Sequence, residues 1–228
     1  MIELKEKIEA FIITNGRSTF SFCLKSFLEQ QNVKIKHYIH KDMSWIDANR
    51  KILDVCSTPY FLRIDDDMLM HPRCIEFMSQ SIDGQKDNIA MRQWMLWEPY
   101  TSKSRKGIKI YNTSIAREIG FRINHLGKID KPFFQDLKKT RYIVKVDPDV
   151  VAIHACSDHA EHIKYAVMRG EDKGKNFEKK RKELKNTISS FNKSIEYQYN
   201  MATDYVEKYN DNNNTNFHRF LRIQNILK

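Results

Sequence analysis

The amino-acid sequence predicts an α/β fold with a mainly parallel central sheet flanked by helices. In the first 64 residues, three apolar runs of strand length alternate with two amphipathic segments of helical periodicity. Strands separated by helices of this length form right-handed βαβ units, and such units build parallel sheets. The expected strands are Ala10–Thr14, Val33–Ile39 and Tyr60–Ile64, and the expected helices span residues 18–30 and 44–55.

Local signals mark where these elements begin and end. The breaker pair Asn15-Gly16 follows the first strand. Ser44 and Asp47 have capping-box spacing at the start of the second helix, although Glu or Gln is the usual partner. Ligands of parallel sheets bind beyond the carboxyl ends of the strands. The segments expected around that crevice are residues 14–17, 40–42 and 65–67.

The middle and the end of the chain have a different character. The expected elements are a strand over Ile89–Leu96, a polar basic loop over Trp97–Lys106, a short helix capped by Asn112 or Thr113 and ending at Ile119, and two strands, Tyr142–Val146 and Val150–His154, joined by Asp147-Pro148-Asp149. A helix is expected over residues 158–169, and the sequence beyond it is basic and helical. We therefore expect an α/β domain over residues 1–172 and a basic helical C-terminal extension over residues 173–228.

The composition favours a cytoplasmic protein that folds around one core. Of the 228 residues, 41% are hydrophobic, which is enough for a single substantial core. No apolar run approaches the ~20 residues of a membrane-spanning helix, and Met1–Glu9 lacks the apolar core of a secretion signal. The four cysteines form no Cys-x-x-Cys pair, so neither a disulfide framework nor a structural zinc site is expected.

The formal net charge of +10 indicates either an anionic partner or a solvated basic surface. Six of the twelve residues in the segment 174–185 are Lys or Arg. We expect the extension to dock on an anionic surface, such as the inner face of a membrane, or on a partner, and a solvated helix is the alternative. A basic nucleic-acid-binding protein is a rival for the whole chain. An acidic segment at the mouth of the sheet argues against backbone binding there, so no specific nucleic acid is expected.

Three adjacent carboxylates, Asp65, Asp66 and Asp67, directly follow the third strand. Three like charges side by side repel one another, and a hard divalent cation such as Mg²⁺ or Mn²⁺ would offset that repulsion because it prefers carboxylate oxygen. Bound to a diphosphate, the same cation would neutralise the charge that develops on a leaving nucleotide. An acidic turn that caps the helix after Pro72 explains the triplet equally well.

The order and spacing of these segments resemble family 2 glycosyltransferases and related enzymes with the GT-A fold, over about residues 11–169. The matching segments are Phe11–Arg17, Lys25–Gln30, Asp47–Leu53 and Ser57–Asp67, followed by Pro72. The resemblance implies a GT-A fold. It also implies transfer of a sugar from a nucleotide-diphosphate sugar donor to a carbohydrate or glycoconjugate acceptor.

The same resemblance implies roles for individual residues. Asp67 and His154, which ends a late strand, would be the protein ligands of Mn²⁺ or Mg²⁺, with diphosphate oxygens and water completing the shell. Asp65 would face the donor ribose or the metal through water, and Asp66 would contact the donor sugar. The other implied donor-binding residues are Thr14, Asn15, Gly16, Arg17, Asn49, Arg50 and Arg169.

The chain departs from the family at the second strand. Family 2 enzymes usually insert another βα unit and an Asp-Gly-Ser-like turn that recognises the base. Here His40-Lys41-Asp42 ends the strand and the next helix follows at once. Asp42 could substitute in base recognition, and a solvated turn residue is the alternative.

Two carboxylates, Asp130 and Asp136, lie where related enzymes carry the catalytic acid on the acceptor side. A direct, inverting displacement needs a general base to take the proton of the acceptor hydroxyl. We expect Asp130, in a turn after Gly127, to be that base, and Asp136 to begin and cap a helix; the alternative is that either carboxylate caps a short helix instead. Aromatic side chains that could stack on a sugar, or pack in the core instead, are those of Trp94, Trp97 and Tyr100.

A nucleotidyltransferase on a related α/β fold is the other rival, because it would also use paired aspartates and Mg²⁺. Such an enzyme should carry a glycine-rich loop after its first strand. This chain has only Asn15-Gly16-Arg17 there and seven glycines in total. The sequence therefore favours a metal-dependent glycosyltransferase.

Overall fold

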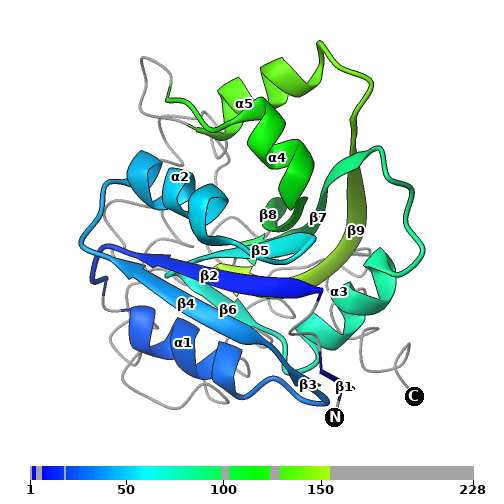
Figure 1. Cartoon of the computed structure of the whole chain (residues 1–228). Coiled ribbons are helices and arrows are strands. Elements are labelled where there is room, and N and C mark those ends of the chain that lie inside the picture. The colour runs from blue at the N-terminus through cyan, green and yellow to red at the C-terminus, as the bar shows by residue number, and fades with distance from the viewer. Residues whose placement is uncertain (1, 4–6, 18, 99–102, 124–128, 155–228) are drawn as a thin grey trace, which may run out of the picture.

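A seven-stranded sheet with helices on both faces forms the centre of the protein (Figure 1). The computed structural model describes residues 2–3, 7–17, 19–98, 103–123 and 129–154. The strands are β1 (Ile2–Glu3), β2 (Ile8–Thr14), β3 (Val33–Lys34), β4 (Lys36–Lys41), β5 (Tyr60–Asp65), β6 (Met68–Met70), β7 (Ile89–Glu98), β8 (Lys103–Asn112) and β9 (Ile143–His154). The helices are α1 (Phe20–Leu28), α2 (Trp45–Val55), α3 (Cys74–Ile82), α4 (Thr113–Ile119) and α5 (Asp130–Leu137).

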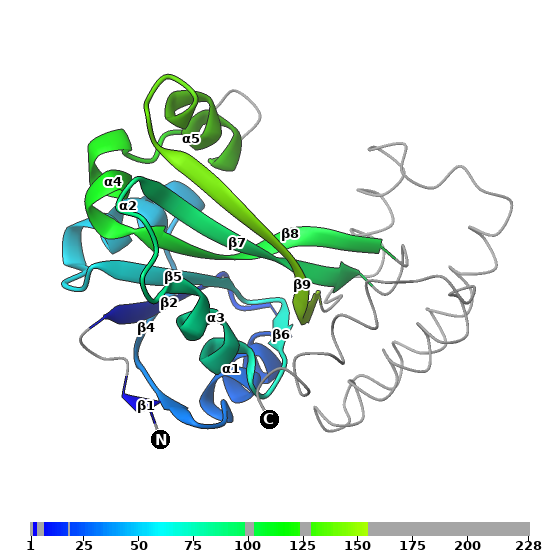
Figure 2. The same cartoon turned by 90° about the vertical axis from the view of Figure 1, so that its right-hand side faces the viewer.

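The strand order is β4-β2-β5-β8-β7-β9-β6, and the sheet is mixed. Strand β2 pairs in parallel with β4 and β5, as the βαβ pattern predicts, and β7 pairs in parallel with β9. The three other pairings, β5 with β8, β7 with β8 and β6 with β9, are antiparallel. Figure 2 shows the long strands β7, β8 and β9 lying side by side. A short separate sheet joins β1 to β3.

Alternate residues of the strands feed two hydrophobic clusters, one on each face of the sheet. Ala10 and Ile12 of β2 pack in the cluster that includes residues of α1 and α3. Phe11 and Ile13 pack in the other cluster, with residues of α2, α4 and α5. Figure 1 shows α2, α4 and α5 on the same side of the sheet and α1 on the opposite side. Because β2 is buried on both faces, its continuous apolar run is the pattern typical of a central parallel strand.

The helix caps follow the local sequence signals. The Ser44 side chain accepts a hydrogen bond from the backbone N–H of Asp47 at 3.2 Å, which confirms the predicted start of α2. The Asn112 side chain accepts one from the backbone N–H of Ile115 at 3.2 Å and caps α4 in the same way. Both helices thus begin where the sequence predicts.

Two expectations for the middle of the chain are wrong. The segment predicted as a polar loop contains the end of β7, and a further strand, β8, begins at Lys103. The predicted pair of strands around Asp147-Pro148-Asp149 is one strand, β9, whose register with β7 shifts at this point. The proline is accommodated because the pairing is irregular there.

Several expectations concern parts of the chain beyond the described residues. They are the helix over residues 158–169 and the extension over residues 173–228. Among the residues that the structure describes, no helix combines the length and the apolar character needed to cross a membrane. Trp94 and Trp97 are buried, so core packing explains both of them. Tyr100 lies outside the described residues.

Candidate functional site

Three segments that are distant in the sequence meet at the carboxyl end of the sheet. Ile13 in β2 pairs with Asp65 in β5, so the turn after β2 lies next to the acidic triplet. His154 at the end of β9 pairs with Met68, immediately after the triplet. We call the group formed by Thr14, Arg17, Asp65–Asp67 and His154 the acidic edge.

Asp66 holds the turn after β2 in place. Its Oδ2 accepts hydrogen bonds from Thr14 Oγ1 at 2.8 Å and from the backbone N–H of Asn15 at 3.2 Å. The backbone N–H of Gly16 then donates to Thr14 Oγ1 at 3.0 Å, and Gly16 has a φ of 83°, which favours glycine. Thr14 and Asp66 are buried, so this turn is a fixed feature of the edge.

The Arg17 guanidinium offsets the charge of the neighbouring carboxylates. Its Nη1 contacts Asp67 Oδ2 and lies 3.5 Å from Asp66 Oδ1. On the other side, His154 Nε2 lies 3.2 Å from the same Asp67 oxygen. One carboxylate oxygen is therefore shared between an arginine and a histidine. The side chain of Arg17 is 35% exposed, so it can turn toward a bound ligand.

Asp65 differs from its two neighbours. Burial raises the pKa of Asp65, whereas the Arg63 guanidinium, with Nε 3.8 Å from Asp65 Oδ1, acts to lower it. Within the described part of the chain, Asp65 Oδ1 is buried and has no hydrogen-bond partner. A buried carboxylate oxygen without a hydrogen-bond donor is destabilising, so a ligand group or an ion that binds this atom would offset that cost.

A buried arginine connects Asp65 to Asp130, one of the two carboxylates predicted on the acceptor side. Arg63, in the middle of β5, donates to Asn49 Oδ1 at 3.1 Å and to Asp130 Oδ1 at 3.2 Å. The other oxygen of Asp130 accepts from Lys109 Nζ at 2.5 Å. Asp65, Arg63, Asp130 and Lys109 thus form an alternating row of negative and positive groups, which we call the charge row.

The charge row lowers the proton affinity of Asp130. Burial raises the pKa of this carboxyl, but the charges of Arg63 and Lys109 outweigh burial and hold the pKa well below its usual range. The carboxylate is therefore ionised throughout the neutral range. It is a weak proton acceptor for as long as both cations remain beside it.

The structure reverses the predicted positions of Asp130 and Asp136: Asp130 begins a helix, and Asp136 does not. Asp130 is the first residue of α5 and does not lie in a turn, whereas Asp136 lies in the last turn and caps no helix start. Asp136 is instead bound to Arg122 at 2.6 Å and to Lys139 at 2.9 Å, and these partners lower its pKa to about 2. The sequence argument failed because Pro132 occupies the third helical position, where the first turn still tolerates proline.

The acidic edge supplies two of the predicted metal ligands, Asp67 and His154, within contact of each other. In the described residues, no group of three or more His, Cys, Asp and Glu side chains is arranged to hold a metal ion. Two protein ligands fit a divalent ion that takes its remaining oxygens from a bound diphosphate and water. The orphaned Asp65 Oδ1 adds a further oxygen to the same edge.

The other predicted donor-binding residues lie away from these contacts. Asn49 is buried in α2 and positions Arg63, so it reaches the edge indirectly. Arg50 donates from Nε to the Phe121 carbonyl at 3.4 Å, and Asp42 is an exposed residue with a φ of 57° after β4. Arg169 lies outside the described residues. For Asp42, Arg50 and Arg169, donor binding stays a prediction.

Sequence reasoning missed the two cations of the charge row. A charged residue in an apolar strand was the available signal: Arg63 lies between Leu62 and Ile64, and Lys109 between Ile108 and Ile110. Charged residues are rarely buried unless they are paired. Each therefore indicated a carboxylate partner elsewhere in the chain.

The arrangement is that of the GT-A fold, as the sequence predicts, and similarity to a solved mannosyltransferase confirms the fold. The mannosyltransferase PcManGT from Pyrobaculum calidifontis, in complex with GDP-Man and Mn²⁺, matches 71% of this chain and 61% of its own, with 11% identity and a TM-score of 0.51. TarS from S. aureus matches 72% of this chain and 64% of its own, with 13% identity and a TM-score of 0.47. CMP:2-keto-3-deoxy-manno-octonic acid synthetase, complexed with CTP, matches 73% of this chain and 100% of its own, with 10% identity and a TM-score of 0.48.

These similarities concern the fold alone. Those to TarS and the synthetase are too low to carry an argument about function. No protein-family model and no curated protein matches the chain. The chain spans less than two thirds of the mannosyltransferase and of TarS.

Proposed function

We propose that this protein is a glycosyltransferase that moves a sugar from a nucleotide-diphosphate sugar to a carbohydrate or glycoconjugate acceptor. The observation that carries the proposal is the acidic edge, where Asp66 and Asp67 lie beside the polar turn of β2 and His154. A fold shared with a mannosyltransferase in complex with GDP-Man and Mn²⁺ supports it. Membership of family 2, and inversion by direct displacement, are part of the proposal.

On the donor side, Asp67 and His154 would hold Mn²⁺ or Mg²⁺. When bound, the ion supplies positive charge that neutralises the leaving diphosphate. Arg17 would turn from the carboxylates to the phosphate oxygens, since a guanidinium binds phosphate through two parallel hydrogen bonds. Asp66 is buried and engaged by Thr14 and Asn15. We therefore assign it to positioning the turn, and Asp65 to the donor ribose or a metal-bound water.

On the acceptor side, we propose Asp130 as the general base. Its side chain is 42% exposed, and through Arg63 it lies in one row with Asp65 of the donor side. Asp136 is tied to Arg122 and Lys139 on the surface, so we assign it a structural role. For Asp130 to accept a proton, its pair with Lys109 has to loosen when the acceptor binds, because that pair depresses its pKa.

A thermal-shift screen of UDP, GDP, CDP and ADP and of the corresponding nucleoside triphosphates, with and without Mn²⁺, tests the donor assignment. A ligand at 100 times its dissociation constant stabilises the native state by about 2.7 kcal/mol. At least one diphosphate should raise the melting temperature in Mn²⁺, and Asp67→Asn should abolish that shift. Asp54→Asn, an exposed carboxylate on α2, is the matched control and should keep it. Stabilisation by nucleoside triphosphates alone would favour a nucleotidyltransferase instead.

A further inference from the structure

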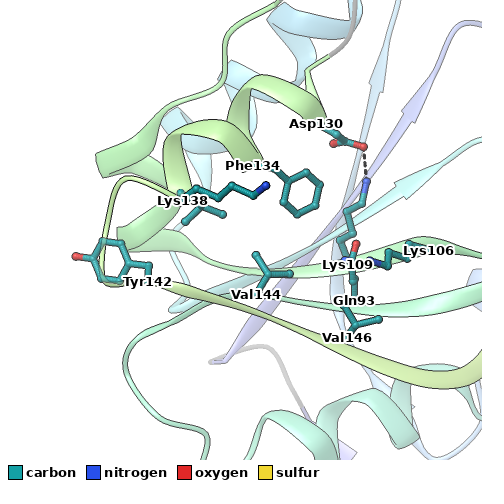
Figure 3. A pocket seen from close by; sticks show the side chains of 10 residues that line it. Gln93, Lys106, Lys109, Asp130, Phe134, Lys138, Tyr142, Val144 and Val146 are labelled. Carbon is teal, nitrogen blue, oxygen red and sulfur yellow. Dashed lines mark hydrogen bonds and ion pairs between the residues drawn. The ribbon is translucent and has the colours of Figure 1, made fainter.

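A cavity of about 520 Å³ lies beside Asp130, between α5 and the long strands of the sheet (Figure 3). Its floor includes a row of residues in register across three strands: Lys109 in β8 pairs with Gln93 in β7, which pairs with Val146 in β9. Phe134 and Leu137 of α5, with Lys138 directly after the helix, form one wall. The volume lies within the range of small-molecule sites, about 300–1,000 Å³.

The lining of the cavity has a positive charge. The lining includes three lysines, Lys106, Lys109 and Lys138, and one carboxylate, Asp130. Its formal charge is therefore +2 (three lysines minus one aspartate). Asp130 neutralises Lys109, and Lys106 and Lys138 are exposed to solvent at the rim. A positively charged cavity next to a transfer site attracts anions and repels cations.

The rest of the lining is aromatic and aliphatic. Phe134, Tyr142, Val144 and Val146 contribute ring faces and methyl groups. Val146 is 40% exposed, so its methyl groups are accessible to a ligand. Aromatic and methyl surfaces suit the C–H faces of a pyranose ring, whereas Gln93 and the lysines suit its polar substituents.

The cavity adjoins the donor side through the charge row. Asp130 lines the cavity and contacts Arg63, whose Nε lies 3.8 Å from Asp65 Oδ1 of the acidic edge. A group bound in the cavity is therefore beside the carboxylate assigned as general base. This is the location that an acceptor hydroxyl needs for transfer.

We propose that this cavity is the acceptor site and that the acceptor saccharide carries an anionic group, a phosphate or a carboxylate, which Lys106 and Lys138 bind. This inference rests on the proposed function and adds the chemical class of the acceptor. The ring of the saccharide packs on Phe134 and the valines, and its anionic substituent lies at the lysine rim. A neutral saccharide makes the same ring contacts but lacks the two charge-assisted hydrogen bonds.

Ligand-observed NMR titrations of the full chain, without nucleotide, test the inference with four probes: glucose, glucose 6-phosphate, glucuronate and inorganic phosphate. At least one of the two anionic sugars should bind about tenfold or more tightly than glucose, as expected for added hydrogen bonds to charged groups. The better of the two identifies the substituent. The double variant Lys106→Gln/Lys138→Gln should lose the difference. The control Lys34→Gln/Lys51→Gln, which removes two exposed lysines outside the cavity, should keep it.

Equal binding of glucose and both anionic sugars overturns the inference, and so does inorganic phosphate binding as tightly as glucose 6-phosphate. Asp67→Asn separates the two proposals, because Asp67 does not line the cavity. This variant should lose nucleotide binding and keep the preference for anionic sugars. Nucleotide binding without an anionic preference refutes only the acceptor class. An anionic preference in a protein that binds no nucleotide refutes the glycosyltransferase and leaves a site for anionic saccharides.

Discussion

Replacing Arg63 by Met should destabilise the protein and uncouple the two sides of its site. The Nη2 of Arg63 lies 3.2 Å from Asp130 Oδ1, and two unit charges at this separation attract by about 5 kcal/mol at an effective dielectric constant of about 20. Solvent reaches Asp130, and Lys109 remains as its second partner, so part of this energy is recovered in the variant. We expect a coupling energy between Arg63 and Asp130 of about 2 kcal/mol.

A double-mutant cycle in urea measures this coupling energy. It uses Arg63→Met, Asp130→Asn and the combined variant, each compared with the unchanged protein by its free energy of unfolding. The matched control is the cycle of Arg122→Met and Asp136→Asn, whose exposed pair has the shorter distance of 2.6 Å. If burial decides the strength of an ion pair, the Arg63–Asp130 pair gives the larger coupling energy despite its longer N–O distance. A coupling energy no larger than that of Arg122 and Asp136 would refute the view that the charge row is a structural link.

Three further predictions concern turnover, pH and the C-terminal extension. Asp130→Asn should lower transfer by about 10²–10⁴-fold with donor binding unchanged, whereas Asp136→Asn should keep turnover and lower only the melting temperature; full activity of Asp130→Asn would remove it as the base. Burial, with the Arg73 charge, lowers the pKa of His71 to about 4. The unfolded chain, with a pKa near 6.5, therefore binds the proton first, and stability should fall by about 3 kcal/mol as the pH drops from 7 to 4. His71→Asn should flatten this part of the stability–pH curve, and an unchanged slope would assign it to other groups. Truncation before Gly174 should reduce co-sedimentation with anionic vesicles, and equal binding by both forms would reject surface docking.

Much of the first half of the fold could be predicted because its signals are local. The apolar run of β2, the cap at Ser44 and the acidic triplet at the end of β5 each lie within a few residues. Strand β8 was missed because its three lysines and one arginine resemble the basic residues of a solvated loop. One of them, Lys109, is buried against a carboxylate 21 residues away, and a local pattern does not contain such a partner.

The part of the site that could be predicted is the part formed where the ends of parallel strands meet. Placing Thr14 and Arg17 beside the triplet required only the rule that parallel strands end at the same edge, and the structure brings them together. The Arg63–Asp130 contact spans 67 residues and crosses from β5 to α5. It depends on how α5 packs on the sheet, which the spacing of residues in the sequence does not reveal. The same packing decides which of the two aspartates reaches Arg63, which is Asp130, and which pairs with Arg122, which is Asp136.

Release of nucleoside diphosphate from nucleotide sugars is the most direct test of the acidic edge as a donor site. The assay incubates the full chain and Mn²⁺ with UDP-, GDP- and CDP-sugars, each with and without an anionic sugar acceptor, and quantifies the freed diphosphate. The proposed function predicts release from at least one donor, faster with acceptor, lost in Asp67→Asn and kept in Asp54→Asn. Equal release by Asp67→Asn and the unchanged protein, or no release from any donor, would contradict it.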